Sequence, residues 1–277
     1  MAAPPVRRPA VSGRFYPGSA DDLDREVRGL LAPLLPFAHA ATARAAIVPH
    51  AGYAYSGVTA AHVFARLALP RRIVILAPNH TGRCDAPGGV SLWEEGAFAT
   101  PLGLVPIDAP LAEAIRAACP LVGVDHGAHR DEHAIEVELP FIQVRRPDAA
   151  IVPLVLAWEE WEHARALGEA LARVVRQSAE PVLLLASSDL NHYEAAAVSE
   201  LKDAQALGAI AALDGAELLR RCRVERISMC GRAAAATVLA AARALGATTG
   251  EVVDYRHSGW VTGDEARVVG YGGVVIL

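Results

Sequence analysis

The sequence lacks the features that would place it in a membrane or a secretory pathway. It contains no stretch of about eighteen residues that is both apolar and uncharged, so no transmembrane helix is predicted. Residues 1–22 include two early arginines but no apolar centre, so no signal peptide is predicted. We therefore expect a cytoplasmic protein that does not contact a membrane.

Cysteine is scarce, and its spacing does not fit a structural metal site. The sequence has four cysteines, Cys84, Cys119, Cys222 and Cys230, and none forms a Cys-x-x-Cys pair, which excludes a zinc ribbon. Disulfides are not expected in a reducing compartment. Each cysteine is therefore either a small buried apolar residue or a ligand or nucleophile.

Several catalytic motifs are also missing. No Walker A sequence and no Gly-x-Gly-x-x-Gly follows a predicted strand, so nucleotide binding has no support. The sequence at 187–189 lacks the Gly-x-Ser-x-Gly turn of a serine hydrolase. Positive charge is not in excess, because 26 basic and 31 acidic residues give a net charge of −5. That balance argues against a nucleic-acid partner.

The chain is long and apolar enough for one large α/β domain. Its 277 residues are 53% hydrophobic and 21% charged, as in folded globular proteins. Short apolar runs predict buried strands at 44–49, 72–77, 150–156 and 181–186, and two further strands at 250–256 and 266–276. Helical patterns occur at 57–68, 108–118, 133–146, 159–177, 199–213 and 231–245. The alternation predicts a single α/β domain over 1–277, with a mostly parallel central sheet covered by helices and a peripheral N-terminal segment of about 1–20.

Three predicted strands are followed closely by a histidine. His50 comes after 44–49, His80 after 72–77, and His192 after 181–186, with Asp189 just before it. Ligands of open α/β sheets bind outside the carboxyl ends of the strands. We therefore expect a functional site where these histidines meet at one edge of the sheet.

Cys230 comes just before an alanine-rich predicted helix. The positive end of a helix dipole favours the thiolate, which is the form that binds metals or attacks electrophiles. Taken alone, this cysteine is better interpreted as a small buried residue.

Residues 129–133 match the His-x-x-Glu-His pattern of inverted zinc peptidases. We do not expect that chemistry. Asp131 and Glu132 are typical of a helix start and the apolar rhythm begins only at Ala134, which leaves His129 in the preceding loop. His133 and Glu136 either face the cleft or belong to a solvated helix end.

Six short motifs, taken in order, resemble the Memo-like family, known in bacteria and archaea as AmmeMemoRadiSam system protein B. They cover nearly the whole chain, at 8–17, 48–57, 78–80, 131–141, 187–193 and 230–232. Asn79 stands where relatives often carry serine, and Thr81 where some carry a second histidine. Motif membership leaves open whether Arg14, Tyr16 and Tyr53 line the pocket or belong to the core.

The resemblance implies a class III extradiol dioxygenase (LigB)-like fold. It also implies a metal site in which His50, His80 and Cys230 hold the ion. Asp189 and His192 match further pocket residues. His192 takes the place of the acid–base histidine of those dioxygenases and would move a proton, whereas Asp189 would orient an imidazole or bind substrate. Two imidazoles and a thiolate suit iron(II), the expected cofactor, with copper or zinc as alternatives.

We therefore predict a non-haem, metal-dependent redox or dioxygenase-like enzyme. Its substrate, a small molecule or a modified macromolecule, is not identified by the sequence. The alternatives are a non-catalytic module that binds a peptide or a protein in the same cleft, and a redox sensor, because a thiolate oxidises easily. The resemblance also implies a functional link to radical SAM and AMMECR1-type proteins.

Overall fold

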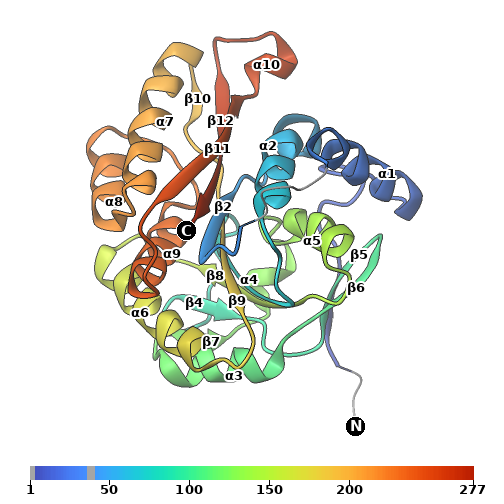
Figure 1. Ribbon diagram of the computed structural model, residues 1–277, viewed down its shortest axis with the longest axis vertical. Coiled ribbons are helices and arrows are strands. Elements are labelled where there is room, and N and C mark those ends of the chain that lie inside the picture. The colour runs from blue at the N-terminus through green and yellow to red at the C-terminus, as the bar shows by residue number, and fades with distance from the viewer. Residues whose placement is uncertain (1–3, 36–40) are drawn as a thin grey trace.

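The computed structural model describes residues 4–35 and 41–277 (Figure 1). The strands are β1 (Val6–Arg7), β2 (Ala45–Val48), β3 (Arg72–Pro78), β4 (Val90–Leu92), β5 (Ala97–Thr100), β6 (Gly103–Pro106), β7 (Val122–Val124), β8 (Ala150–Leu156), β9 (Val182–Ser187), β10 (His192–Glu194), β11 (Gly250–His257) and β12 (Val268–Ile276). The helices are α1 (Ala20–Leu31), α2 (Tyr53–Arg66), α3 (Ala109–Ala118), α4 (Gly127–Arg130), α5 (Leu139–Arg145), α6 (Trp161–Gln177), α7 (Ala196–Ala211), α8 (Gly215–Val224), α9 (Arg232–Ala244) and α10 (Gly259–Thr262), with short 3-10 helices η1 (Ala32–Leu34) and η2 (Glu136–Glu138).

A mixed sheet with a parallel centre forms the middle of the fold. Its strand order is β10-β12-β2-β9-β3-β8-β4-β7, and β11 pairs with β12. The central strands β2, β9, β3 and β8 run parallel to one another, whereas β12 and β4 join them in antiparallel fashion. The predicted helix-covered, mostly parallel central sheet is confirmed, and antiparallel strands extend it on both sides. Strands β1, β5 and β6 form a separate small sheet.

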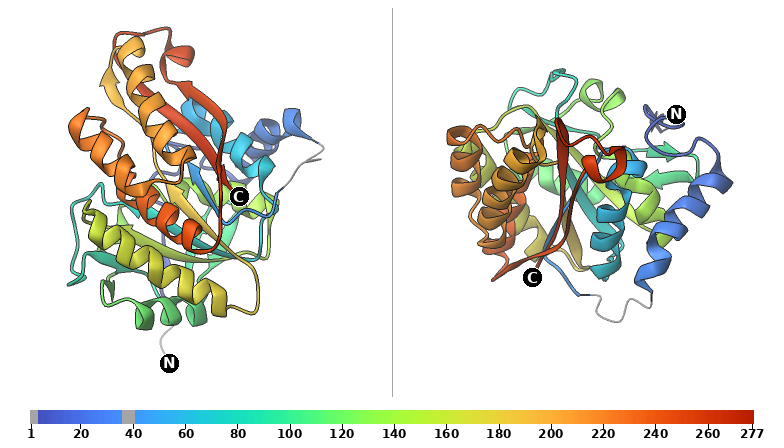
Figure 2. Two further views of the ribbon diagram at one scale, coloured as in Figure 1. Left: turned by 60° about the vertical axis from the view of Figure 1, so that its left-hand side comes forward. Right: turned by 90° about the horizontal axis from the view of Figure 1, so that it is seen from above.

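Helices cover both faces of the central sheet (Figure 2). In β3, Val74 and Leu76 join the core that includes residues of α3, α6, α7, α8 and α9. The alternate positions Ile73 and Ile75 join the core that includes residues of α1, α2 and α5. This period of two is what a strand buried on both faces requires. No helix within 4–35 or 41–277 is long and apolar enough to cross a membrane.

The predicted helix over 133–146 is wrong in its first part. The segment forms η2 and then α5, so regular helix begins only at Leu139. The carboxylate of Glu132 accepts hydrogen bonds from the backbone N–H groups of His133 and Ala134. The Glu132 side chain thus accepts the N–H groups of this segment in place of helical carbonyls, and His133 lies outside a regular helix.

A buried ion pair ties the start of the chain to this segment. Arg7 and Glu136 are 2% and 0% exposed. The guanidinium of Arg7 donates to the carboxylate of Glu136 and to the backbone carbonyl of Glu132. Its Nε also donates to the carbonyl of His129, at 3.1 Å. One side chain thereby holds the backbone on both sides of 130–131.

Glu136 fixes the N-terminal segment in return. It accepts from the backbone N–H groups of Ala10, at 2.7 Å, and Val11, at 3.1 Å. The hydroxyl of Tyr16 also donates to it. Such a carboxylate depends on its cation, because an unpaired charge in a protein interior is costly.

We expect the Arg7→Met variant to lose about 3–5 kcal/mol of unfolding free energy, because Glu136 would remain buried without its cation. Urea denaturation of both proteins measures this difference. The control is Arg165→Met, which breaks exposed pairs with Glu162 and Glu169 and should leave stability nearly unchanged. Equal effects of the two substitutions would contradict the role given to Arg7.

Candidate metal site

The site is built where parallel strands end. His50, His80 and Asp189 each stand two residues beyond the last residue of β2, β3 and β9 respectively. Because β9 lies between β2 and β3, these loops meet at one edge of the sheet. The ring centroids of His50 and His80 are 5.2 Å apart.

His133 completes a group of three histidines. One ring nitrogen from each of His50, His80 and His133 lies within 4.8 Å of the others, a spacing that could hold a metal ion. The ring of His133 stacks on that of His80 at a centroid distance of 4.6 Å. This group corrects the prediction that the ligand set is His50, His80 and Cys230.

Cys230 lies beside the three histidines rather than among them. Its Sγ is 3.3 Å from Nε2 of His50, and it accepts a hydrogen bond from the backbone N–H of Asp189 at 3.3 Å. Burial, followed by the negative charge of Asp189, raises the pKa of Cys230 to about 12. Burial therefore outweighs the effect of the helix dipole on this thiol.

Gly231 brings Cys230 against the strand ends. A Cβ atom on Gly231 would lie 2.4 Å from the carbonyl oxygen of Ser187 and 2.5 Å from Cβ of Ser188. The backbone N–H of Gly231 also donates to Oγ of Ser188, at 2.9 Å. Only glycine permits this close approach, so the thiol is placed by backbone packing.

Two side chains, Glu132 and Ser187, orient the imidazoles of His80 and His50 by contacting their Nδ1 atoms. Nδ1 of His80 is 2.9 Å from the carboxylate of Glu132, which also accepts the backbone N–H of His80 at 2.6 Å. Nδ1 of His50 is 2.9 Å from Oγ of Ser187. Both contacts occupy Nδ1, so Nε2 of each ring remains for a metal ion. Neither partner was predicted from the sequence, although Glu132 and Ser187 both lie inside the motifs that carry the family resemblance.

The pKa values of Glu132 and of the three histidines are shifted in different directions. Burial raises the pKa of Glu132, but its hydrogen bond to His80 and the charge of His80 outweigh burial, and the pKa falls to about 2. Burial lowers the pKa of His80, yet Glu132 more than offsets it and the net pKa is raised. Burial, followed by the charges of neighbouring imidazoles, lowers the pKa of His50 to about 3 and that of His133 to about 4. The last two are therefore neutral at neutral pH, the state in which imidazole binds metals.

Asp189 holds backbone rather than an imidazole. Its Oδ1 accepts the backbone N–H groups of His50, at 2.8 Å, and Ala51, at 3.3 Å. The loop after β2 is thereby fixed to the loop after β9. Orientation of an imidazole, the alternative considered for Asp189, falls instead to Glu132 and Ser187.

His192 is held with one ring nitrogen free. Its Nδ1 is 2.9 Å from the carbonyl oxygen of Ser228, which can only accept, so Nδ1 carries the proton. The backbone N–H of His192 donates to Oγ of Ser228 at 2.8 Å. Nε2 is consequently left as a proton acceptor.

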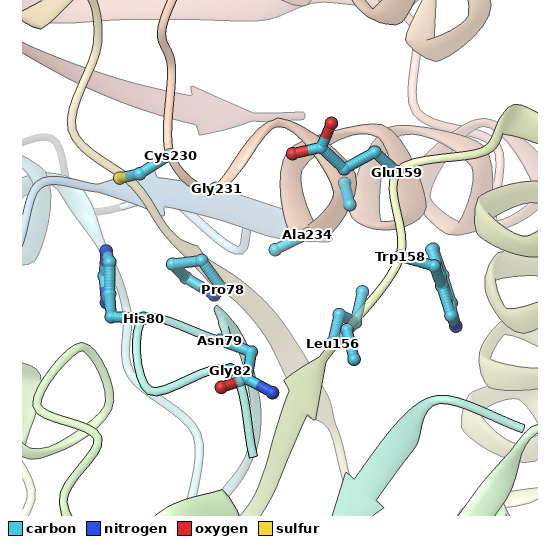
Figure 3. A pocket seen from close by; sticks show the side chains of 12 residues that line it. Pro78, Asn79, His80, Gly82, Leu156, Trp158, Glu159, Cys230, Gly231 and Ala234 are labelled. Atoms are coloured by element: carbon cyan, nitrogen blue, oxygen red, sulfur yellow. The ribbon is translucent and has the colours of Figure 1, made fainter. Parts of the chain in front are cut away.

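Two pockets meet at the site. The larger, of about 570 Å³, is lined by His50, His80, His133, Asp189, His192 and Cys230, and by a rim that includes Arg14, Phe15, Tyr55, Tyr193 and Tyr271. The smaller, of about 290 Å³, shares His80 and Cys230 with the first (Figure 3). In that view Cys230 and His80 lie at one end, with Trp158 at the other. The site is therefore reachable by a small molecule.

The structure shows which of the remaining motif residues line the pocket and which belong to the core. Arg14 lines the larger pocket, whereas Tyr16 and Tyr53 are each 3% exposed and belong to the core. His133 faces the cleft, but Glu136 points away from it, toward Arg7.

His129, the first residue of the peptidase-like pattern, is buried in α4, which corrects its prediction as a loop residue. Its Nε2 is 2.9 Å from the carbonyl oxygen of Ser91. It therefore does not join His133 in a metal pair.

Comparison with known proteins gives matches along the whole chain. A family model described as Memo-like protein matches residues 7–275. A MEMO1 family protein of Aquifex aeolicus is 40% identical over 273 residues, which cover 98% of this chain and 99% of the relative. A MEMO1 family protein of Methanopyrus kandleri is 38% identical over 280 residues, covering 97% and 98%. A solved structure of an uncharacterized protein from Escherichia coli K12 aligns with a TM-score of 0.48 and 14% identity, covering 82% of this chain and 98% of that one.

Replacing Glu132 with Gln should weaken metal binding about 10- to 100-fold, because the His80 imidazole would lose its anionic partner. Anaerobic titration with iron(II) or zinc(II) against a competing chelator measures the change. The matched control is Asp131→Asn, which alters the neighbouring exposed carboxylate paired with Arg83. A metal affinity unchanged by Glu132→Gln would exclude Glu132 as an outer partner.

Proposed function

The chain belongs to the Memo-like family, and from this premise we propose that it is a non-haem, metal-dependent redox enzyme with a class III extradiol dioxygenase-like site. One observation carries the proposal: three imidazoles with their ligating nitrogens within 4.8 Å of one another line a pocket of about 570 Å³. A structural metal site is closed by protein ligands, whereas a catalytic one leaves positions open toward a pocket.

The donor set fits a transition metal. His50, His80 and His133 would hold the ion, and Cys230, 3.3 Å from Nε2 of His50, would complete the set once its proton leaves. Nitrogen donors with one sulfur donor suit borderline-soft ions, and we propose iron(II), with copper and zinc as competitors. Bound iron would supply one-electron redox chemistry and the activation of oxygen.

The remaining groups would handle protons and geometry. Nε2 of His192 would accept a proton from the substrate and later return it, because Nδ1 is committed to the carbonyl of Ser228. Asp189 would keep the His50 loop in register with β9 through two backbone hydrogen bonds. The aromatic rim of Phe15, Tyr55 and Tyr193 would exclude water from the bound substrate.

Metal content tests the proposal directly. Protein purified without oxygen should contain stoichiometric iron by elemental analysis, and His80→Ala should abolish it, because His80 is one of the three histidine donors. Cys230→Ala should reduce occupancy without affecting the fold. The control, His163→Ala, changes an exposed histidine on α6 and should leave the iron content unchanged. Wild-type protein that stays metal-free after reconstitution would favour the alternative, a non-catalytic module that binds a peptide or protein.

His192→Ala separates metal binding from turnover. We expect this variant to retain its iron, since His192 is outside the three-histidine group. Substrate-dependent oxygen uptake should fall about 10²- to 10⁴-fold, the usual contribution of a positioned acid–base group. Unchanged oxygen uptake would remove His192 from the mechanism.

A further inference from the structure

Ser187 is the centre of a buried hydrogen-bond chain beneath the three histidines. Its Oγ lies 2.9 Å from Nδ1 of His50, 2.7 Å from the carbonyl oxygen of Ala134 and 2.9 Å from Oε1 of Glu138. Ser187 and Glu138 are both 0% exposed. Glu138 is therefore linked to a candidate metal ligand without touching it.

Counting protons along this chain leaves one consistent arrangement. A serine hydroxyl has one proton and two lone pairs, and a carbonyl oxygen can only accept. The contact of 2.7 Å with Ala134 must therefore use the Ser187 proton, since two bare oxygens would repel at that distance. The two other neighbours of Oγ must then both donate to it. Nδ1 of His50 does so as N–H, and Oε1 of Glu138 can do so only as O–H.

We propose that Glu138 is a neutral carboxylic acid that donates its proton to Ser187, and that this chain fixes His50 in the tautomer with an unprotonated Nε2. Glu138 is thus a positioning residue, acting on His50 through Ser187. The consequence for metal binding rests on the function proposed above, whereas the protonation state of the chain does not.

The other side of the His50 ring is compatible with this assignment. Nε2 is 3.3 Å from Sγ of Cys230, and a thiol can donate to an unprotonated Nε2.

The surroundings of Glu138 also disfavour a charge. Burial, followed by the charge of Asp189, raises the pKa of Glu138 well above its usual range. Its Oε2 has no hydrogen-bond partner among the described residues. Glu132, by contrast, receives hydrogen bonds from backbone N–H groups and from Nδ1 of His80. A buried carboxylate without such donors is expected to be protonated.

The first test reads the tautomer itself. In protein labelled with ¹⁵N-histidine, long-range ¹H–¹⁵N correlations distinguish Nδ1–H from Nε2–H. Wild type and Glu138→Gln should both show His50 as Nδ1–H, because the Gln amide replaces the donated O–H. Ser187→Ala should lose this preference. A Glu138→Gln spectrum in which His50 changes tautomer would mean that Glu138 is an ionised acceptor, and would overturn the proposal.

The second test reads the metal, with zinc(II) as the probe in a chelator competition. Affinity should change by no more than about threefold in Glu138→Gln but fall about 10- to 100-fold in Glu138→Leu and Ser187→Ala. Loss in Glu138→Gln as large as in Glu138→Leu would overturn the proposal. If Glu138→Leu fails to fold, Ser187→Ala supplies the comparison. Wild type that binds no metal would overturn the proposed function, while the tautomer spectrum would still decide the state of Glu138.

Discussion

The ion pair between Arg7 and Glu136 holds together segments that are distant in the sequence. Arg7 binds backbone carbonyls on either side of 130–131, and Glu136 binds the backbone at Ala10 and Val11. The loop fixed in this way presents Glu132 and His133 to the site. Phe15, from the same N-terminal segment, packs edge-on against His133 at 4.9 Å. The geometry of the three histidines therefore depends on a charge pair that none of them contacts.

The buried carboxyl groups of Glu132 and Glu138 differ in the hydrogen-bond donors that surround them. Glu132 meets several donors, including an imidazole, and is ionised. Glu138 contacts the hydroxyl of Ser187, whose proton is donated to the carbonyl of Ala134, and Glu138 is therefore neutral. Each orients a histidine, one directly and one through Ser187. Local donor supply, rather than depth of burial alone, decides which acid carries charge.

The sequence was sufficient to predict the strands that support the site. Apolar runs flanked by histidines placed His50 and His80 at one edge, because buried parallel strands have a simple signature. His133 could not be ranked above a solvated helix end, because the capping by Glu132 that frees it from a helix is a tertiary contact. Cys230 was expected just before a helix, where the dipole favours a thiolate, but burial and the charge of Asp189 depend on neighbours that no local pattern reveals.

The strand order also bears on how the protein is made. Strand β12 follows every other strand in the chain, yet it lies inside the sheet, paired with β2, β10 and β11. His50 comes from the loop after β2 and Cys230 from a position 180 residues later. During synthesis, the strand that carries His50 must wait for β12 to pair with it on that side. The sheet around His50 is therefore completed late, after the segments that carry His80, His133 and Cys230 have been made.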